Sequence, residues 1–204
     1  GAFMYRVPAL AAALTLAATC AIAQTQAPQP DEHTLFLAHF DDSFDADHAN
    51  GDPTAEVDGA EPVTDGKWGG AVRLGEGQDI SFDPAGNLDM TRGTLAFWFR
   101  PDWEPGAPNS HALLSMGLDG DPPGYFVLSQ GWWETSGGAG RMYYVHDNQA
   151  YLHCNTTALA NMEAEDLARW HHIALTWQEG APGHNAIYLD GEKVAYTAKD
   201  TGEI

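Results

Sequence analysis

Short segments in which apolar and polar side chains alternate constrain the fold of this chain most strongly. Two of them show the pattern clearly, 94–100 (TLAFWFR) and 170–177 (WHHIALTW). An extended strand would direct their alternate apolar side chains to one face: Leu95, Phe97 and Phe99 in the first, Ile173, Leu175 and Trp177 in the second. His171 and His172 are neighbours on the second strand, so they would point to opposite faces and could not bind one metal ion together.

Other short β-like segments follow at intervals of about ten residues, each bounded by Gly, Pro, Asp or Asn. They are residues 34–40, 71–74, 79–82, 111–116, 125–129, 141–146, 149–154, 185–189 and 192–197. Asp190-Gly191 between the last two predicts a type I′ hairpin turn. A long acidic loop is expected at 41–59, and a connecting helix at 161–169. Trp98 and Trp177 are expected to add apolar area to the core. This pattern predicts an all-β sandwich or barrel.

The N-terminal segment has the composition of a secretory signal. Residues 1–3 precede Met4, and Arg6 then stands before an apolar run that ends in Ala21-Ile22-Ala23. We therefore expect a signal peptide within 1–23, a polar Pro-containing linker at 24–33 and a domain over 34–204. The apolar run is too short to span a bilayer. The predicted location is extracellular or periplasmic, and Cys154, alone after cleavage, is expected to be a small buried residue.

The charge is strongly acidic, with 29 Asp and Glu against 9 Lys and Arg, a net charge of −20. Such a chain would repel phosphate backbones, so nucleic-acid binding is excluded. Anionic membranes and acidic polysaccharides are disfavoured as bulk electrostatic partners for the same reason. Cations and neutral glycans fit better, while the alternative is that the acidity only keeps an extracellular protein soluble.

Four segments in order resemble the laminin-G-like, concanavalin A-like lectin/glucanase jelly-roll family. They are GKWGGAVRLGEGQDISF (66–82), GTLAFWFRPDW (93–103), WHHIALTW (170–177) and IYLDGEKVAY (187–196). The resemblance implies a two-sheet antiparallel β-sandwich of a kind shared by lectins and appended glycan-binding modules, and fold alone does not fix the ligand. Family members continue past the Asp-Gly hairpin with further strands, so we expect the domain to be truncated at its C-terminus, with further domains of the same polypeptide.

Catalytic patterns known on this fold are not found in the sequence. Retaining glucanases on it resemble one another in a Glu-x-Asp-x-x-Glu strand, whose carboxylates must lie about 5 Å apart. The nearest acidic cluster, Glu163, Glu165 and Asp166, falls in the predicted helical connector instead. The sequence therefore predicts a non-catalytic module.

The acidic loop suggests a cation site. Six of its side chains carry hard oxygen ligands of the kind that calcium prefers: Asp41, Asp42, Asp45, Asp47, Asn50 and Asp52. The spacing is not that of an EF-hand, and solvated turns are rich in the same residues. Structural calcium is common in the family that the chain resembles, so the resemblance supports calcium as the cofactor.

A glycan site requires aromatic faces flanked by polar groups. Trp132 and Trp133 sit beside turn residues, and a run of aromatic and polar residues follows on the next hairpin. We predict a shallow glycan site at this loop end, formed by Trp132, Trp133, Tyr144, Asp147 and Asn148. The alternative is that these aromatic side chains complete the core.

The sequence as a whole predicts a secreted module that binds a glycan or an extracellular protein. Two alternatives stay open: an N-terminal accessory domain of a larger polysaccharide-degrading enzyme, and a structural cell-surface adhesion domain.

Overall fold

The computed structural model of the chain describes residues 26–103, 111–118, 124–130, 142–146, 150–154, 163–178 and 186–195. Within 111–154, the side chains of 113–115 are the described ones. The regular elements of this part of the chain are all strands except for one short helix. No helix within it has the length and apolar character needed to span a bilayer.

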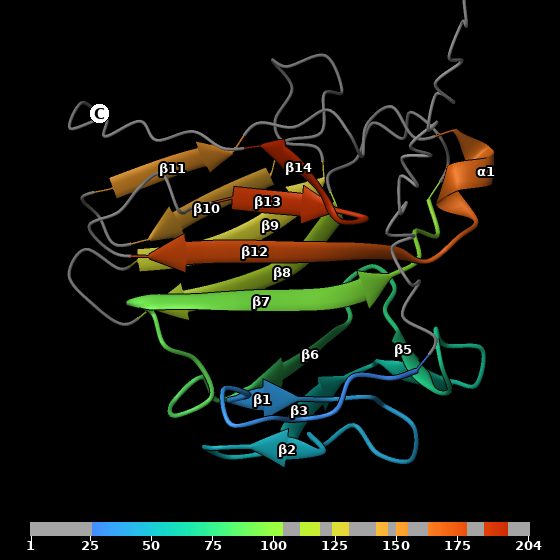
Figure 1. Cartoon of the computed structure of the whole chain (residues 1–204). Helices are drawn as coiled ribbons and strands as arrows, with labels where there is room; N and C mark the ends of the chain where they lie inside the picture. The colour runs from blue at the N-terminus through green and yellow to red at the C-terminus, as the bar shows by residue number, and fades with distance from the viewer. Residues whose placement is uncertain are drawn as a thin grey trace, which may run out of the picture.

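A four-stranded antiparallel sheet forms the front layer of the molecule (Figure 1). Its order is β14 (Glu192–Ala195), β13 (Ala186–Leu189), β12 (His171–Gln178) and β7 (Arg92–Phe99). Strands β7 and β12 are the two segments with the clearest alternation, and they pair over their whole length, with His172 opposite Trp98.

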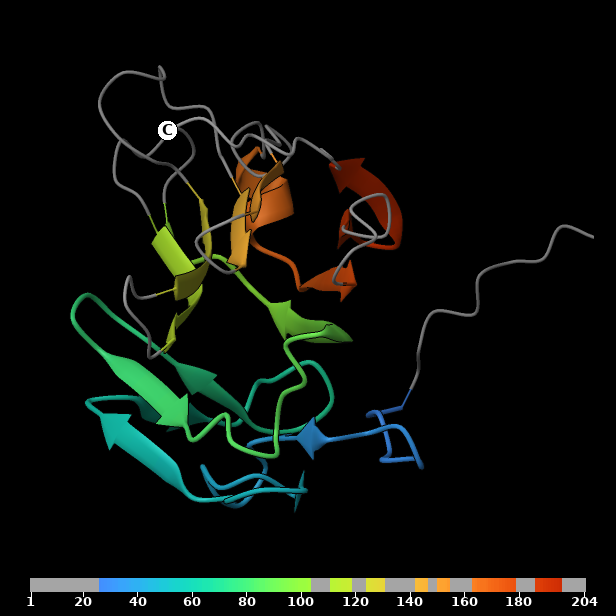
Figure 2. The ribbon, with the colours of Figure 1, turned by 90° about the vertical axis from the view of Figure 1, so that its left-hand side faces the viewer.

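A second layer lies behind this sheet. It contains the antiparallel pairs β8 (His111–Leu118) with β9 (Gly124–Gln130) and β10 (Met142–His146) with β11 (Ala150–Cys154). These strands lie behind the front sheet in Figure 1, and the view turned by 90° in Figure 2 shows the two layers apart. Leu113 and Leu114 of β8 pack against the buried cluster of the front sheet. The predicted two-layer antiparallel β-sandwich is therefore confirmed.

The core lies between the layers and follows the predicted alternation. Its buried members are Leu167, Ile173, Leu175, Trp177, Ile187 and Leu189, with Leu95, Phe97 and Phe99 packed against them. The indole Nε1–H of Trp177 donates to the main-chain oxygen of Asp89 at 2.9 Å, so its one polar group is satisfied. Trp98 does not join this core, because its position on β7 places it on the opposite face.

Six short strands, which precede the sandwich strands in the sequence, form three two-stranded ladders. They are β1 (Phe36–Leu37) with β2 (His48–Ala49), β3 (Ala55–Asp58) with β6 (Asp79–Phe82), and β4 (Glu61–Val63) with β5 (Ala71–Arg73). The expectation of a plain loop over 41–59 is wrong, since β2 and β3 lie within it. The strand predicted at 34–40 is shorter, and Phe40, with φ of 64°, turns the chain at its end.

The two connections at the end of the front sheet are of the types that the sequence predicts. The helix predicted at 161–169 is a single turn, α1 (Ala164–Leu167), whose Leu167 is buried. The type I′ turn is confirmed, because Asp190 and Gly191 have φ of 52° and 85° and Leu189 pairs with Glu192. Both connections meet at the start of β12, and they frame the site described below.

Candidate functional site

A shallow, open pocket lies on the outer face of the front sheet, where the end of β7 meets the start of β12. Its volume is about 450 Å³, and its lining combines two indoles with charged and polar side chains. The lining residues are Lys67, Trp98, Arg169, Trp170, His172, Asp190 and Gly191. They come from a loop before β5, from β7, from the chain between α1 and β12, from β12 itself and from the β13–β14 turn.

Trp98 forms the centre of the pocket. The β7–β12 register places His172 directly opposite it, with ring centroids 5.1 Å apart. Trp68 meets the indole of Trp98 edge-on at 5.3 Å, and the ammonium group of Lys67 lies 4.3 Å from the centroid of the Trp98 ring. These neighbours fix the orientation of an aromatic side chain that stands on the outer face of the sheet.

Trp170 forms a second aromatic wall, one residue before β12 begins. The guanidinium group of Arg100 lies 5.2 Å from the centroid of the Trp170 ring. Arg100 is held there by Asp65, whose carboxylate lies 2.8 Å from Nη2. The hydrogen bond from Arg100, together with its charge, lowers the pKa of Asp65 below its usual range. Each of the two indoles that line the pocket therefore has a cation over its ring, Lys67 over Trp98 and Arg100 over Trp170.

His172 supplies a neutral polar group beside the indole of Trp98. Its partial burial disfavours the imidazolium and lowers its pKa below 6.5, although the nearby Asp190 carboxylate opposes the shift. At neutral pH the imidazole is therefore uncharged. One ring nitrogen can donate a hydrogen bond and the other can accept one.

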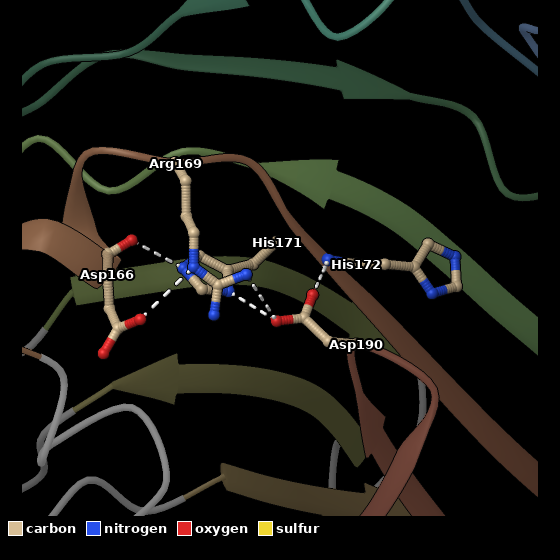
Figure 3. A network of polar contacts seen from close by, with 5 residues as sticks. All are labelled: Asp166, Arg169, His171, His172 and Asp190. Carbon is tan, nitrogen blue, oxygen red and sulfur yellow. Dashed lines mark hydrogen bonds and ion pairs between the residues drawn. The ribbon is translucent and has the colours of Figure 1, made fainter. Parts of the chain in front are cut away.

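Asp190 holds the floor of the pocket in place through three contacts (Figure 3). Its Oδ1 accepts the backbone N–H of His172 at 2.9 Å, and its Oδ2 lies 2.8 Å from His171 Nδ1 and 3.4 Å from Arg169 Nη1. Burial raises the pKa of Asp190, but these hydrogen bonds and charges outweigh it and the pKa is lowered. His171 and His172 point to opposite faces, as predicted: His171 is fully buried and His172 faces the pocket.

Residues 74–203 match the model of a laminin G family described as the concanavalin A-like lectin/glucanases superfamily. The chain belongs to this superfamily. The matched region includes both layers of the sandwich, and it extends over all the pocket residues except Lys67. Comparison with curated proteins and with solved structures gave no match. Laminin-G-like domains are in general carbohydrate- or protein-binding modules, and the superfamily also contains glycosidases.

The six side chains predicted to bind calcium lie in residues 41–52, before the region that matches the family model. Four of them accept backbone N–H groups: Asp41 from Gly70, Asp45 from Ala55, Asp47 from His39 and Asp52 from Thr54. The remaining two, Asp42 and Asn50, lie in the same segment. Among the described residues, no group of three or more His, Cys, Asp and Glu side chains could hold a metal ion. Calcium binding stays a prediction, which a thermal melt with added calcium would test.

The glycan site predicted at the loop end lies largely outside the described residues. Trp132, Trp133, Asp147 and Asn148 are not among them, and Tyr144 is placed on β10 opposite Leu152 without a described side chain. That site also stays a prediction. The sequence reasoning missed the Trp98 pocket. The expectation that Trp98 adds apolar area to the core is wrong, and the register that places it opposite His172 cannot be read from the sequence.

Proposed function

We propose that this chain is a secreted, non-catalytic carbohydrate-binding module and that the Trp98 pocket is its glycan site. The observation that carries the proposal is a pocket on an outer face of the sandwich whose lining includes two indoles, Trp98 and Trp170, and the neutral imidazole of His172 in contact with Trp98. The superfamily membership supports the same class of function.

The chemistry of the pocket suits a sugar ring. A pyranose presents C–H groups on its faces, which pack on aromatic rings, and hydroxyl groups around its edge, which need donors and acceptors. Trp98 and Trp170 offer aromatic surface, while His172, Arg169 and Lys67 offer polar groups beside it. An open, shallow pocket suits one or two residues of a longer glycan.

The arrangement of carboxylates supports a binding role over hydrolysis. A retaining glycosidase requires two carboxylates about 5 Å apart that flank the scissile bond. Asp190 is the one carboxylate among the described residues that line the pocket, and His171 and the His172 backbone already engage it. Secretion is supported by the signal-like composition of residues 1–23.

The test is a glycan array followed by calorimetry on the best ligand, with the purified chain. We expect Trp98→Ala and Trp170→Ala each to weaken binding at least tenfold, with melting curves confirming that both variants are folded. A double Trp132→Ala, Trp133→Ala variant separates this pocket from the loop site predicted from the sequence. Full affinity in the Trp98 and Trp170 variants, with loss in the double variant, would move the site to that loop.

A further inference from the structure

Three of the six Lys and Arg residues that the structure describes lie at one place. Nine Lys and Arg residues stand against 29 Asp and Glu, yet three of the nine surround the pocket. Lys67 and Arg169 line it, and Arg100 lies over the Trp170 ring. A binding site for neutral sugars does not require three cations. Their presence at this pocket points to a negatively charged ligand.

The three cations differ in how far acidic neighbours neutralise them. Arg100 pairs with Asp65 at 2.8 Å, and Arg169 lies 3.2 Å from Asp166 and 3.4 Å from Asp190. For Lys67, the part of the chain that the structure describes provides no carboxylate within ion-pair distance; its ammonium group lies over Trp98 instead. An ammonium over an indole face still has N–H groups to donate.

The net charge of −20 does not prevent such a cation from selecting an anion. At physiological salt, charges separated by more than about 8 Å are largely screened, so contacts within the pocket determine its preference. A hydrogen bond between an ammonium and an anionic oxygen is roughly twice as strong as a neutral one. Arg169, at the opposite wall, retains N–H donors beyond those it uses on its acidic neighbours.

We propose that the Trp98 pocket selects an acidic sugar, with the Lys67 ammonium group binding a carboxylate or sulfate on a ring that packs against the indoles. This inference rests on the proposed function, because it names the sugar class that the same site takes. Lys67 is then the residue that determines specificity, while Trp98 and Trp170 supply the surface common to all sugars.

Calorimetry with matched ligands tests the proposal. The first pair is an oligogalacturonate and its methyl ester, and the second is a heparin oligosaccharide and its desulfated form. At 0.15 M salt we expect one acidic member to bind about tenfold more tightly than its neutral counterpart, the gain of one charge-assisted hydrogen bond. The ligand pair in which the acidic form binds more tightly than the neutral form shows whether the anion is a carboxylate or a sulfate.

Variants of Lys67 assign the selectivity to its charge. Lys67→Met keeps the aliphatic packing on Trp98 and should bring the ratio of acidic-sugar to neutral-sugar affinity to about one, whereas Lys67→Arg should keep the wild-type ratio. Arg73→Gln removes an exposed charge on β5 and controls for bulk electrostatics. Equal binding of acidic and neutral ligands, or an unchanged preference in Lys67→Met, would overturn the inference and leave the proposed function standing. Binding to none of the array glycans would reject both.

Discussion

The imidazole of His171, which has no exposed surface, lies 2.8 Å from the carboxylate of Asp190. Its other nitrogen, Nε2, lies 2.8 Å from the main-chain oxygen of Asp166. Both partners can only accept a hydrogen bond, whereas a neutral imidazole donates from one nitrogen. The His171 ring is therefore held between two acceptors beneath the pocket, one from Asp190 and one from the main chain.

The first prediction concerns Asp190→Asn. Asparagine also adopts the left-handed conformation of this turn, so the substitution removes the charge and keeps the backbone. A hydrogen bond to a charged group contributes about 1.5–3 kcal/mol. Because the Asp190 side chain is 33% exposed, we expect a loss of about 2 kcal/mol in the free energy of unfolding, measured by urea denaturation.

Asp166→Asn is the matched control for that change. It removes a carboxylate whose ion pair with Arg169 is well exposed, and it leaves the main-chain oxygen that His171 uses. We expect a change below about 0.5 kcal/mol. Equal losses of unfolding free energy in Asp190→Asn and Asp166→Asn would show that the contact between His171 and Asp190 adds no stability of its own.

The second prediction follows from the lowered pKa of His172. Between that pKa and the ordinary value of 6.5, the unfolded chain binds more protons than the folded domain. This contribution to stability is therefore fully present above pH 6.5 and is lost as the pH falls. Melting temperatures at pH 8 and pH 5 should differ less in His172→Gln than in the wild type. His33→Gln, at an exposed position, should leave the wild-type difference unchanged.

The third prediction concerns the contact between Gly93 and Trp177. A Cβ atom at Gly93 would overlap the indole of Trp177, which the hydrogen bond to Asp89 fixes in place. Gly93→Ala should therefore destabilise the domain by about 1–3 kcal/mol. Gly75→Ala meets only the flexible end of Gln78 and should change stability by about 0.5 kcal/mol at most. A fully stable Gly93→Ala domain would contradict the packing described here.

The sequence predicted those parts of the fold whose information is local. The alternation of β7 and β12 and the Asp190-Gly191 turn depend on neighbouring residues, and all three are confirmed. Strand β3 was missed because three of its four residues are exposed, so it shows no alternation; it exists through its pairing with β6, where Val57 faces Ile80. The pocket was missed for a related reason. It depends on the β7–β12 register and on a loop that brings Lys67 and Trp68 onto Trp98.

The last prediction concerns Asn87, a buried amide that ties the acidic segment to the loop after β6. Its Nδ2 donates to the main-chain oxygens of Asp52 and Asp83 at 2.8 and 2.9 Å, and its Oδ1 accepts the Gly51 N–H at 2.9 Å. Asn87→Ala leaves these three backbone groups without their partner, and we expect a loss of about 2–3 kcal/mol in unfolding free energy.

Asn87→Asp makes this prediction specific to the amide. The aspartate has the same shape, but when ionised it cannot donate to the two main-chain oxygens, so it should destabilise the domain more at pH 7 than at pH 4, where protonation restores one donor. Hydrogen exchange at the Gly51 amide should accelerate in Asn87→Ala and remain slow in Gln29→Ala, which removes a donor used only on its exposed neighbour Pro28. Slow exchange in Asn87→Ala would mean that the loop is held by contacts other than this amide.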